Sequence, residues 1–157
     1  MRKAKITDVP SITEIIEGAK LTLREIGSPQ WQADYPNEET ILDDIERGYG
    51  WVEERDGQVV AYLAAVTDGD PNYYFIEGHW LPSDWKYTAI HRVAIHRDYL
   101  GQGVASTMFD ALDFGELRID THALNLPMRR LIEKSGFSYR GVIYVADGTP
   151  RMAYQKI

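Results

Sequence analysis

The sequence predicts an α+β fold in which a mixed, mostly antiparallel sheet is flanked by helices. Three observations indicate this class: apolar residues recur at helical spacing up to Arg47, two Asp-Gly pairs lie between runs of strand-forming residues, and a strand-helix-strand order occupies the second half. Hairpins give antiparallel pairs, whereas a helix between neighbouring strands gives a parallel pair. A chain of 157 residues suits a single core, so we expect one domain, residues 1–157.

The first third of the chain is expected to form a short strand and two helices. The strand covers residues 3–6, and Asp8 is expected to cap a helix that Gly27 ends. The apolar stripe of this helix consists of Ile12, Ile15, Ile16, Ala19, Leu23 and Ile26. An aromatic loop, residues 28–37, then leads to a second helix over residues 38–47.

Strands are expected in the middle of the chain. The pair Asp56-Gly57 is a strong hairpin signal within residues 49–66. Two further strands are expected at residues 73–80 and 85–96. These segments form the antiparallel part of the expected sheet.

The second half is expected to alternate helices and strands. The first helix has an apolar stripe of Val104, Met108, Ala111 and Leu112. A strand follows at residues 117–123, and Asn125 is expected to cap a helix that ends at Gly136. A hairpin that turns at Asp147-Gly148 closes the chain.

The amino-acid composition restricts the class of function. The chain has 24 acidic residues against 17 Lys and Arg, a formal net charge of −7, which argues against nucleic-acid binding. This charge either attracts cationic ligands such as amines or only aids solubility. No apolar run approaches the ~20 residues of a membrane span, and no signal-peptide pattern is present. The absence of cysteine excludes thiolate nucleophiles and fits a cytoplasmic location.

The segment HRDYLGQGVAST, residues 96–107, joins an expected strand to an expected helix. Unpaired backbone N–H groups and the helix dipole converge at such a helix start, which favours an anion such as a phosphate. Glycine also serves ordinary turns, so the segment either binds an anion or only connects two elements. It is neither a Walker loop nor a dinucleotide fingerprint, because the Gly-Lys-Ser/Thr and the third glycine are absent.

This segment resembles the motif of the GNAT superfamily of acetyl-CoA-dependent N-acetyltransferases, a Gln/Arg-x-x-Gly-x-Gly/Ala loop between a strand and a helix. Leu100, Gly103 and Ala105 occupy the three defining positions, and Leu100 departs from the usual Gln or Arg. A second segment, IDTHALNLPMRRLIEKSGF, resembles the strand, Asn-capped helix and Gly-Phe end of the family. The order of elements fits over essentially the whole chain, which implies a GNAT-like acyl-CoA N-acyltransferase fold.

The resemblance implies acetyl-CoA as the acyl-donor cosubstrate. The pantetheine arm is expected on the backbone of residues 93–95, and the pyrophosphate on the amides of residues 101–106. The predicted cofactor-binding residues are Val93, Ala94, Ile95, Leu100, Gly101, Gln102, Gly103, Val104, Ala105, Ser106 and Asn125. Asn125 contacts the pantetheine, caps its helix, or does both.

Acetyl transfer to an amine needs a base and a group that stabilises the oxyanion. A backbone N–H of residues 93–95 is expected to polarise the thioester carbonyl. His91 is the first candidate base, because a histidine side chain can exchange a proton near neutral pH and His91 shares strand parity with Val93. The alternative is a hydrogen-bonded sheet histidine. Glu77 is the second candidate, and the alternative is an ordinary exposed carboxylate. Ile132 stands where many family members have a tyrosine.

No metal is expected, because the four histidines show no ligand spacing. The acceptor pocket is expected to be lined by Trp31, Gln32, Tyr35, Glu77 and Trp80. Aromatic side chains beside a carboxylate suit a cationic amine. The alternative is that Trp31 and Tyr35 only clamp the helices onto the sheet.

The sequence therefore predicts an N-acetyltransferase that acts on a primary amine of a small molecule or a peptide. No nucleic-acid or membrane partner is expected. Small sheets with open edges often pair, so a homodimer is one of the arrangements open to the chain. The alternative from another class is a non-catalytic acyl-CoA-binding module, a sensor or interaction domain on the same fold.

Overall fold

The structure is a computed structural model that describes residues 1–82 and 86–157. Its strands form a mixed eight-stranded sheet in the order β1-β2-β3-β5-β6-β8-β7-β4, accompanied by four α-helices within the described residues. Each strand pair with a defined register is antiparallel except β5–β6, which is parallel. The predicted fold class is confirmed. The expected start of a strand at Trp85 lies outside the described residues.

The described chain divides into two compact units. The first unit combines Met1–Ala65 with Arg92–Leu112, and the second combines Val66–His91 with Asp113–Ile157. The strand β5, Thr88–Ile95, contributes its first four residues to the second unit and its last four to the first.

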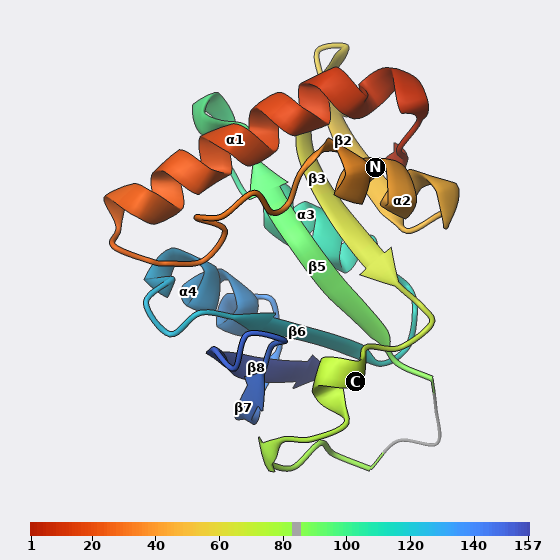
Figure 1. The fold of residues 1–157 in the computed structure, drawn as a ribbon. Helices are drawn as coiled ribbons and strands as arrows, with labels where there is room; N and C mark the ends of the chain where they lie inside the picture. The colour runs from red at the N-terminus through yellow and green to blue at the C-terminus, as the bar shows by residue number, and fades with distance from the viewer. Residues whose placement is uncertain (83–85) are drawn as a thin grey trace. The chain divides into compact units, whose positions relative to one another are not determined.

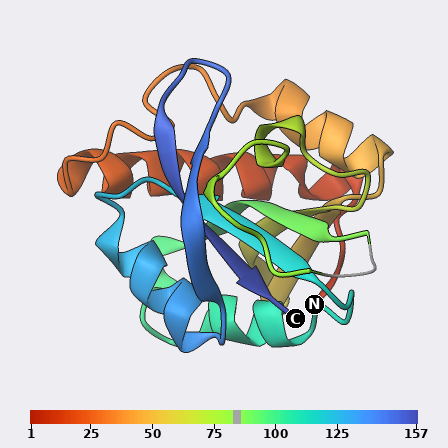
Figure 2. The ribbon, with the colours of Figure 1, turned by 90° about the horizontal axis from the view of Figure 1, so that it is seen from below.

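The first unit packs helices against strands on both faces. Its elements are β1 (Arg2–Lys3), α1 (Val9–Glu25), α2 (Glu38–Glu46), β2 (Gly50–Arg55), β3 (Gln58–Val66) and α3 (Val104–Asp110). Figures 1 and 2 show α1 and α2 on one face of β2 and β3, with α3 on the other face. Because both faces are covered, β3 is buried without interruption from residue 60 to residue 65.

The core of the first unit is built by the predicted apolar stripe of α1. Ile12, Ile15 and Ile16 are at most 2% exposed and pack with Ile41 of α2 and Val52 of β2. Side chains at i, i+3 and i+4 lie on one face of a helix, so this spacing turns all three isoleucines toward the strands. The helix ends as expected at Gly27, which has φ +77°.

The expected cap at the start of α1 is replaced by an ion pair. Asp8 occupies the N-cap position, but its side chain makes no capping hydrogen bond. Its carboxylate accepts hydrogen bonds from the Lys5 amide at 2.8 Å and from Arg2 Nη1 and Nη2 at 2.8 and 2.9 Å. A charged guanidinium is a stronger partner than a helix amide, so Asp8 ties β1 to the start of the helix.

The second unit is a strand assembly with one α-helix. Its elements are the 3₁₀ turn η2 (Pro71–Tyr73), β4 (Glu77–Gly78), β6 (Leu117–Thr121), α4 (Leu126–Lys134), β7 (Ser138–Tyr144) and β8 (Pro150–Lys156). Figure 2 shows α4 and the segment 66–80 on opposite sides of these strands. Asn125 caps α4 as predicted, since its Oδ1 accepts a hydrogen bond from the Met128 amide at 3.3 Å.

The prediction of a strand at residues 73–80 is mostly wrong. Only Glu77 and Gly78 are extended and paired, whereas Pro71–Tyr73 forms the 3₁₀ turn. The Asp70 carboxylate accepts a hydrogen bond from the Asn72 amide at 2.8 Å and so caps this turn. Tyr73 is then held in the core at 2% exposure, which prevents the regular alternation of a strand.

Both predicted Asp-Gly hairpins are confirmed. Asp56 and Gly57 have φ values of +52° and +75° between β2 and β3, as a tight hairpin turn of mirror-image type requires. Gly148 has φ +81° between β7 and β8. Within the described ranges, no helix is both long enough and apolar enough to cross a bilayer.

Candidate functional site

The glycine segment of the first unit exposes backbone amides. Gly101 and Gly103 have φ values of +74° and +76°, and a Cβ built at either position would meet no atom within 4 Å. The first helical hydrogen bond of α3 runs from the Thr107 amide to the Gly103 carbonyl at 3.0 Å. The amides of residues 104–106 therefore lie ahead of the helical ladder, in the position that suits an anionic group.

Side chains within this segment mainly stabilise the loop itself. Gln102 Nε2 donates to the Asp98 carbonyl at 3.0 Å, and His96 Nδ1 accepts from the Asp98 amide at 3.2 Å. Leu100, at the position where the family usually has Gln or Arg, is 50% exposed. What the loop offers a ligand is therefore mainly its backbone.

The strand β5 pairs in parallel with β6 over three residues only. The register runs from Thr88 opposite Leu117 to Ile90 opposite Ile119. Val93, Ala94 and Ile95 lie beyond this ladder, so their peptide groups have no place in it. A strand edge of this kind can hydrogen-bond an extended ligand such as a pantetheine arm.

The extended backbone of β5 is interrupted at Arg92. This residue has φ +54°, a left-handed conformation that is unusual for a non-glycine residue inside a strand. His91 and Arg92 are both half-buried, whereas Val93 and Ala94 are both buried. Burial therefore does not alternate with a two-residue period around Arg92, where a left-handed residue interrupts the extended backbone.

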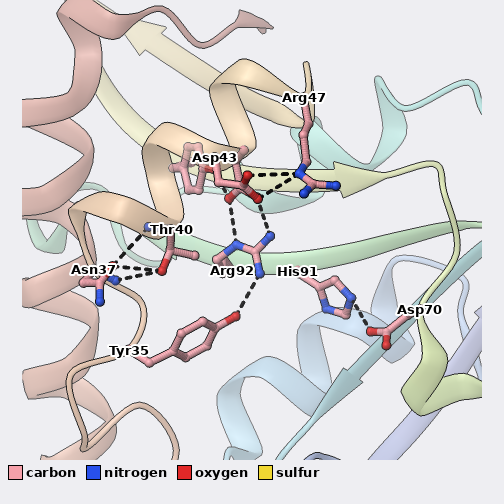
Figure 3. A network of polar contacts seen from close by, with 10 residues as sticks. Tyr35, Asn37, Thr40, Asp43, Arg47, Asp70, His91 and Arg92 are labelled. Carbon is pink, nitrogen blue, oxygen red and sulfur yellow. Dashed lines mark hydrogen bonds and ion pairs between the residues drawn. The ribbon is translucent and has the colours of Figure 1, made fainter.

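Arg92 belongs to a polar network of the first unit. Its Nε and Nη2 donate to the two carboxylate oxygens of Asp44 at 2.8 and 2.6 Å, and its Nη1 donates to the Tyr35 hydroxyl at 2.8 Å. Figure 3 shows Arg92 between the helix α2 and Tyr35. The Tyr62 hydroxyl donates to the same Asp44 carboxylate at 2.6 Å. The Asp44 side chain is only 3% exposed, so the charge of Arg92 is neutralised inside the unit.

His91 belongs to a second network, which lies in the second unit. Its Nε2 is 2.8 Å from Asp70 Oδ2, an interaction visible in Figure 3, and its Nδ1 is 3.9 Å from Asp120 Oδ1. The Tyr73 hydroxyl donates to Asp120 Oδ1 at 2.6 Å. Tyr87 holds the Asp70 backbone, since its hydroxyl accepts from the Asp70 amide at 2.9 Å. His91 thus lies among two carboxylates, and its side chain keeps 20% exposure.

The second candidate base, Glu77, lies apart from His91 in the sheet order. It is an exposed residue of β4, and three strands separate β4 from β5 in that order. Its carboxylate hydrogen-bonds the exposed Tyr144 hydroxyl, which raises the pKa of that tyrosine. Trp80 is partly buried and packs against the core of the second unit, and the Arg118 guanidinium lies 4.3 Å from the centroid of its ring.

The aromatic loop of the first unit serves mainly as an anchor. Gln32 accepts from Arg24 Nε at 2.9 Å and donates to the Lys20 carbonyl at 3.1 Å, so its amide fastens the loop to α1. Trp31 packs against the core of the unit. Tyr35 is 47% exposed, and its hydroxyl meets Arg92. Among the three predicted acceptor residues of this loop, Tyr35 therefore offers the most accessible surface.

Sequence reasoning missed seven members of these networks: Asp44, Tyr62, Asp70, Tyr73, Tyr87, Arg92 and Asp120. One signal was available for Asp44. It lies between Ile41 and Ile45 on the apolar face of its helix, and an acid at a buried position requires a charged partner. The carboxylates around His91 come from separate segments of the chain, so only the folded unit brings them together. Within the described residues, no group of three or more acidic or histidine side chains could hold a metal ion.

Comparison with known proteins places this geometry in a family. The model of the acetyltransferase (GNAT) family matches residues 19–137. A GNAT-family acetyltransferase from Streptococcus agalactiae is 36% identical, with a TM-score of 0.92 over 99% of this chain and 93% of that chain. Among curated proteins no match was found.

Two more distant structures share the fold. A ribosomal-protein-alanine N-acetyltransferase from Brucella melitensis is 20% identical, with a TM-score of 0.69 over 99% of this chain and 98% of that chain. The protein yncA from Salmonella typhimurium, solved with its cofactor acetyl-CoA, is 19% identical, with a TM-score of 0.68 over 99% of this chain and 91% of that chain. The family model and the Streptococcus agalactiae relative establish that the chain belongs to the GNAT family of acetyltransferases, which use acetyl-CoA.

Proposed function

We propose that this protein transfers the acetyl group of acetyl-CoA to a primary amine of a small molecule or a peptide. The observation that carries the proposal is the likeness to a GNAT acetyltransferase over 99% of the chain at 36% identity. The Brucella melitensis structure is named a ribosomal-protein-alanine N-acetyltransferase, which supports a peptide as one acceptor class.

The residues of the first unit fit the cofactor. The open space above Gly101 and Gly103 and the amides of residues 104–106 suit its pyrophosphate. The backbone of residues 93–95, outside the parallel ladder with β6, suits its pantetheine arm. Bound there, acetyl-CoA supplies a thioester whose carbonyl carbon forms a C–N bond with the amine as its C–S bond breaks.

His91 is the base in this proposal. With Nε2 hydrogen-bonded to Asp70 at 2.8 Å, the neutral ring carries its proton on Nε2 and leaves Nδ1 to accept one. A cationic acceptor first loses one proton to solvent, which leaves the neutral amine as the nucleophile. As the C–N bond forms, the nitrogen gives up a second proton, which passes to Nδ1 directly or through a water, and the thiolate takes up a proton from solvent. The carboxylates of Asp70 and Asp120 attract the imidazolium that forms.

The acceptor is a cationic amine in this proposal. The formal net charge of the chain is −7, and a negative field raises the local concentration of cations. Tyr35 presents an exposed aromatic face, which also favours a positively charged ligand.

A thiol-release assay tests the proposal. Because the chain contains no cysteine, a thiol-reactive dye reports only the CoA thiol, with no background from the protein. Acetyl-CoA is first titrated calorimetrically, and then a panel of polyamines, alanine-terminated peptides and acidic amines is screened. Acetyl-CoA binding with turnover of cationic amines supports the proposal. Turnover of acidic amines alone would refute the acceptor class, and absence of acetyl-CoA binding would refute the function.

A further inference from the structure

The conformation of Arg92 is exceptional for its position. The non-glycine residues with positive φ within the described chain are Trp31, Asp56 and Arg92. Trp31 lies in a loop and Asp56 in a hairpin turn, where such conformations are common. Arg92 lies inside β5, where the left-handed conformation has to be held by surrounding contacts.

The contacts that hold Arg92 are buried and geometrically specific. Its guanidinium makes two parallel hydrogen bonds to the Asp44 carboxylate, at 2.8 and 2.6 Å. The Arg92 and Asp44 side chains are 12% and 3% exposed, and Asp44 is held in turn by the Tyr62 hydroxyl at 2.6 Å. A planar guanidinium that is fixed at two nitrogens has little freedom to rotate, so the pair restricts the backbone that carries it.

The restricted residue directly precedes the peptide groups expected to bind the cofactor. The φ and ψ angles of one residue set the direction of the next peptide group, so the conformation of Arg92 determines where the N–H of Val93 points. In an extended conformation the side chains from residue 93 onward would change faces. Val93 and Ala94, at 9% and 2% exposure, are both buried directly after the left-handed residue.

We propose that Arg92 is a positioning residue for acetyl-CoA: its ion pair with Asp44 holds residue 92 in the left-handed conformation, which directs the peptide groups of residues 93–95 toward the cofactor. The inference rests on the proposed function, because it requires acetyl-CoA to bind along β5. Arg92 itself touches neither the cofactor nor the acceptor in this role; it acts through the backbone.

The experiment compares Arg92→Ala with Arg92→Gly. Both variants lose the ion pair, but glycine adopts a positive φ without strain, whereas alanine does not. Acetyl-CoA affinity is measured by calorimetry and corrected for the fraction of folded protein from urea unfolding. We expect Arg92→Ala to bind acetyl-CoA about tenfold more weakly than Arg92→Gly, since the strain of a left-handed alanine corresponds to roughly that factor.

Two controls separate positioning from stability. Arg47→Ala removes an exposed Arg–Asp pair of α2, with Asp43 at 2.9 Å, and should leave acetyl-CoA affinity unchanged. Asp56→Ala and Asp56→Gly repeat the alanine–glycine comparison at φ +52° in a hairpin turn. They should differ in stability but bind acetyl-CoA equally.

Three results of these acetyl-CoA binding measurements would overturn the role proposed for Arg92. Equal acetyl-CoA affinity per folded molecule in Arg92→Ala, Arg92→Gly and the parent protein would overturn it and leave the proposed function intact. Equally weak binding by both variants would also overturn it, because the conformation would then not matter. Failure of the parent protein to bind acetyl-CoA would overturn both proposals. If the lone Asp44 carboxylate prevents folding, the same comparison is made in an Asp44→Asn background, where the same difference is expected.

Discussion

His91 and Arg92 are neighbours in the chain, yet each anchors a different polar network. In the second unit, His91 meets Asp70 and Asp120, and the Tyr73 hydroxyl donates to Asp120 at 2.6 Å. In the first unit, Arg92 meets Asp44, and the Tyr62 hydroxyl donates to Asp44 at 2.6 Å. Both networks thus combine a basic side chain, a carboxylate and a tyrosine hydroxyl.

The two networks differ in the proton that the basic group can exchange. An arginine keeps its charge at all pH values of interest, and burial disfavours that charge, but the hydrogen bonds to Asp44 outweigh this and raise the pKa of Arg92 further. A histidine changes charge near neutral pH. The same three kinds of side chain therefore form a fixed ion pair in the first unit and a group suited to proton transfer in the second.

The tyrosines of the two networks behave alike. Burial, and then the adjacent carboxylate, raises the pKa of Tyr62 and of Tyr73 well above its ordinary value. Both hydroxyls consequently remain protonated donors across the range in which a histidine titrates. The networks then differ mainly in the basic side chain, His91 or Arg92, and in the number of carboxylates around it.

The largest expected effect is on stability, through the network of Arg92. Asp44→Ala leaves the buried guanidinium without its carboxylate, which should lower the free energy of unfolding by about 3–5 kcal/mol. Urea unfolding measures this change. The matched control is Asp43→Ala, whose side chain is 56% exposed and should cost no more than ~0.5 kcal/mol. Similar losses in the two variants would show that the Arg92 pair is not the stabilising element.

The next effect concerns catalysis, through the network of His91. His91→Ala should lower kcat about 100-fold, as expected for the loss of a general base, with little change in acetyl-CoA affinity. The control is His79→Gln, because His79 is exposed and lies outside the proposed mechanism. Steady-state kinetics and calorimetry separate the two quantities. Unchanged turnover in His91→Ala would remove His91 from the mechanism and would leave the contrast between the networks without a catalytic meaning.

A smaller effect on kcat is expected when the hydrogen bond between His91 and Asp70 is weakened. Asp70→Asn removes a charge-assisted hydrogen bond worth about 1.5 kcal/mol, which corresponds to roughly a tenfold fall in kcat. Asp68→Asn, an exposed position of the same loop, serves as the control. If kcat is the same in Asp70→Asn and the parent enzyme while acetyl-CoA affinity falls, Asp70 acts on the fold and not on His91.

An effect of similar size, on acetyl-CoA binding, is expected in the glycine segment that follows β5. Gly103→Ala and Gly48→Ala place a Cβ at φ +76° and +74°, each without a nearby atom, so each should cost about 1 kcal/mol of stability. Only Gly103→Ala should also weaken acetyl-CoA binding, because only that backbone is proposed to meet the pyrophosphate. Equal acetyl-CoA affinities in the two variants would argue that the segment is merely a connection.

The smallest effect is the pH dependence of a partly exposed Arg–Asp pair. The hydrogen bond from Arg2 lowers the pKa of Asp8 in the folded state, so this pair stabilises the protein above the ordinary Asp pKa of about 3.9 and loses its effect as the pH falls through the lower folded value. Asp8→Asn should therefore flatten the stability profile in acid. Urea unfolding at several acidic pH values measures this, and an unchanged slope would contradict the assignment.

The sequence by itself determined the elements whose signals are local. The apolar spacing of α1, the Asn125 cap and both Asp-Gly hairpins lie within a few residues of chain, and each appears where it was predicted. The glycine segment and its family likeness belong to the same kind of information. Helix periodicity and turn chemistry are properties of neighbouring residues, so no long-range contact is needed to read them.

Tertiary structure alone decided the two polar networks and the left-handed conformation of Arg92 in β5. Asp44 lies 48 residues from Arg92, and Tyr73 lies 47 residues from Asp120. The left-handed Arg92 contradicts the local preference for a regular strand. Contacts between distant residues outweigh a local preference of order 1 kcal/mol, because burying a charge or a tyrosine hydroxyl requires a partner wherever in the chain that partner lies.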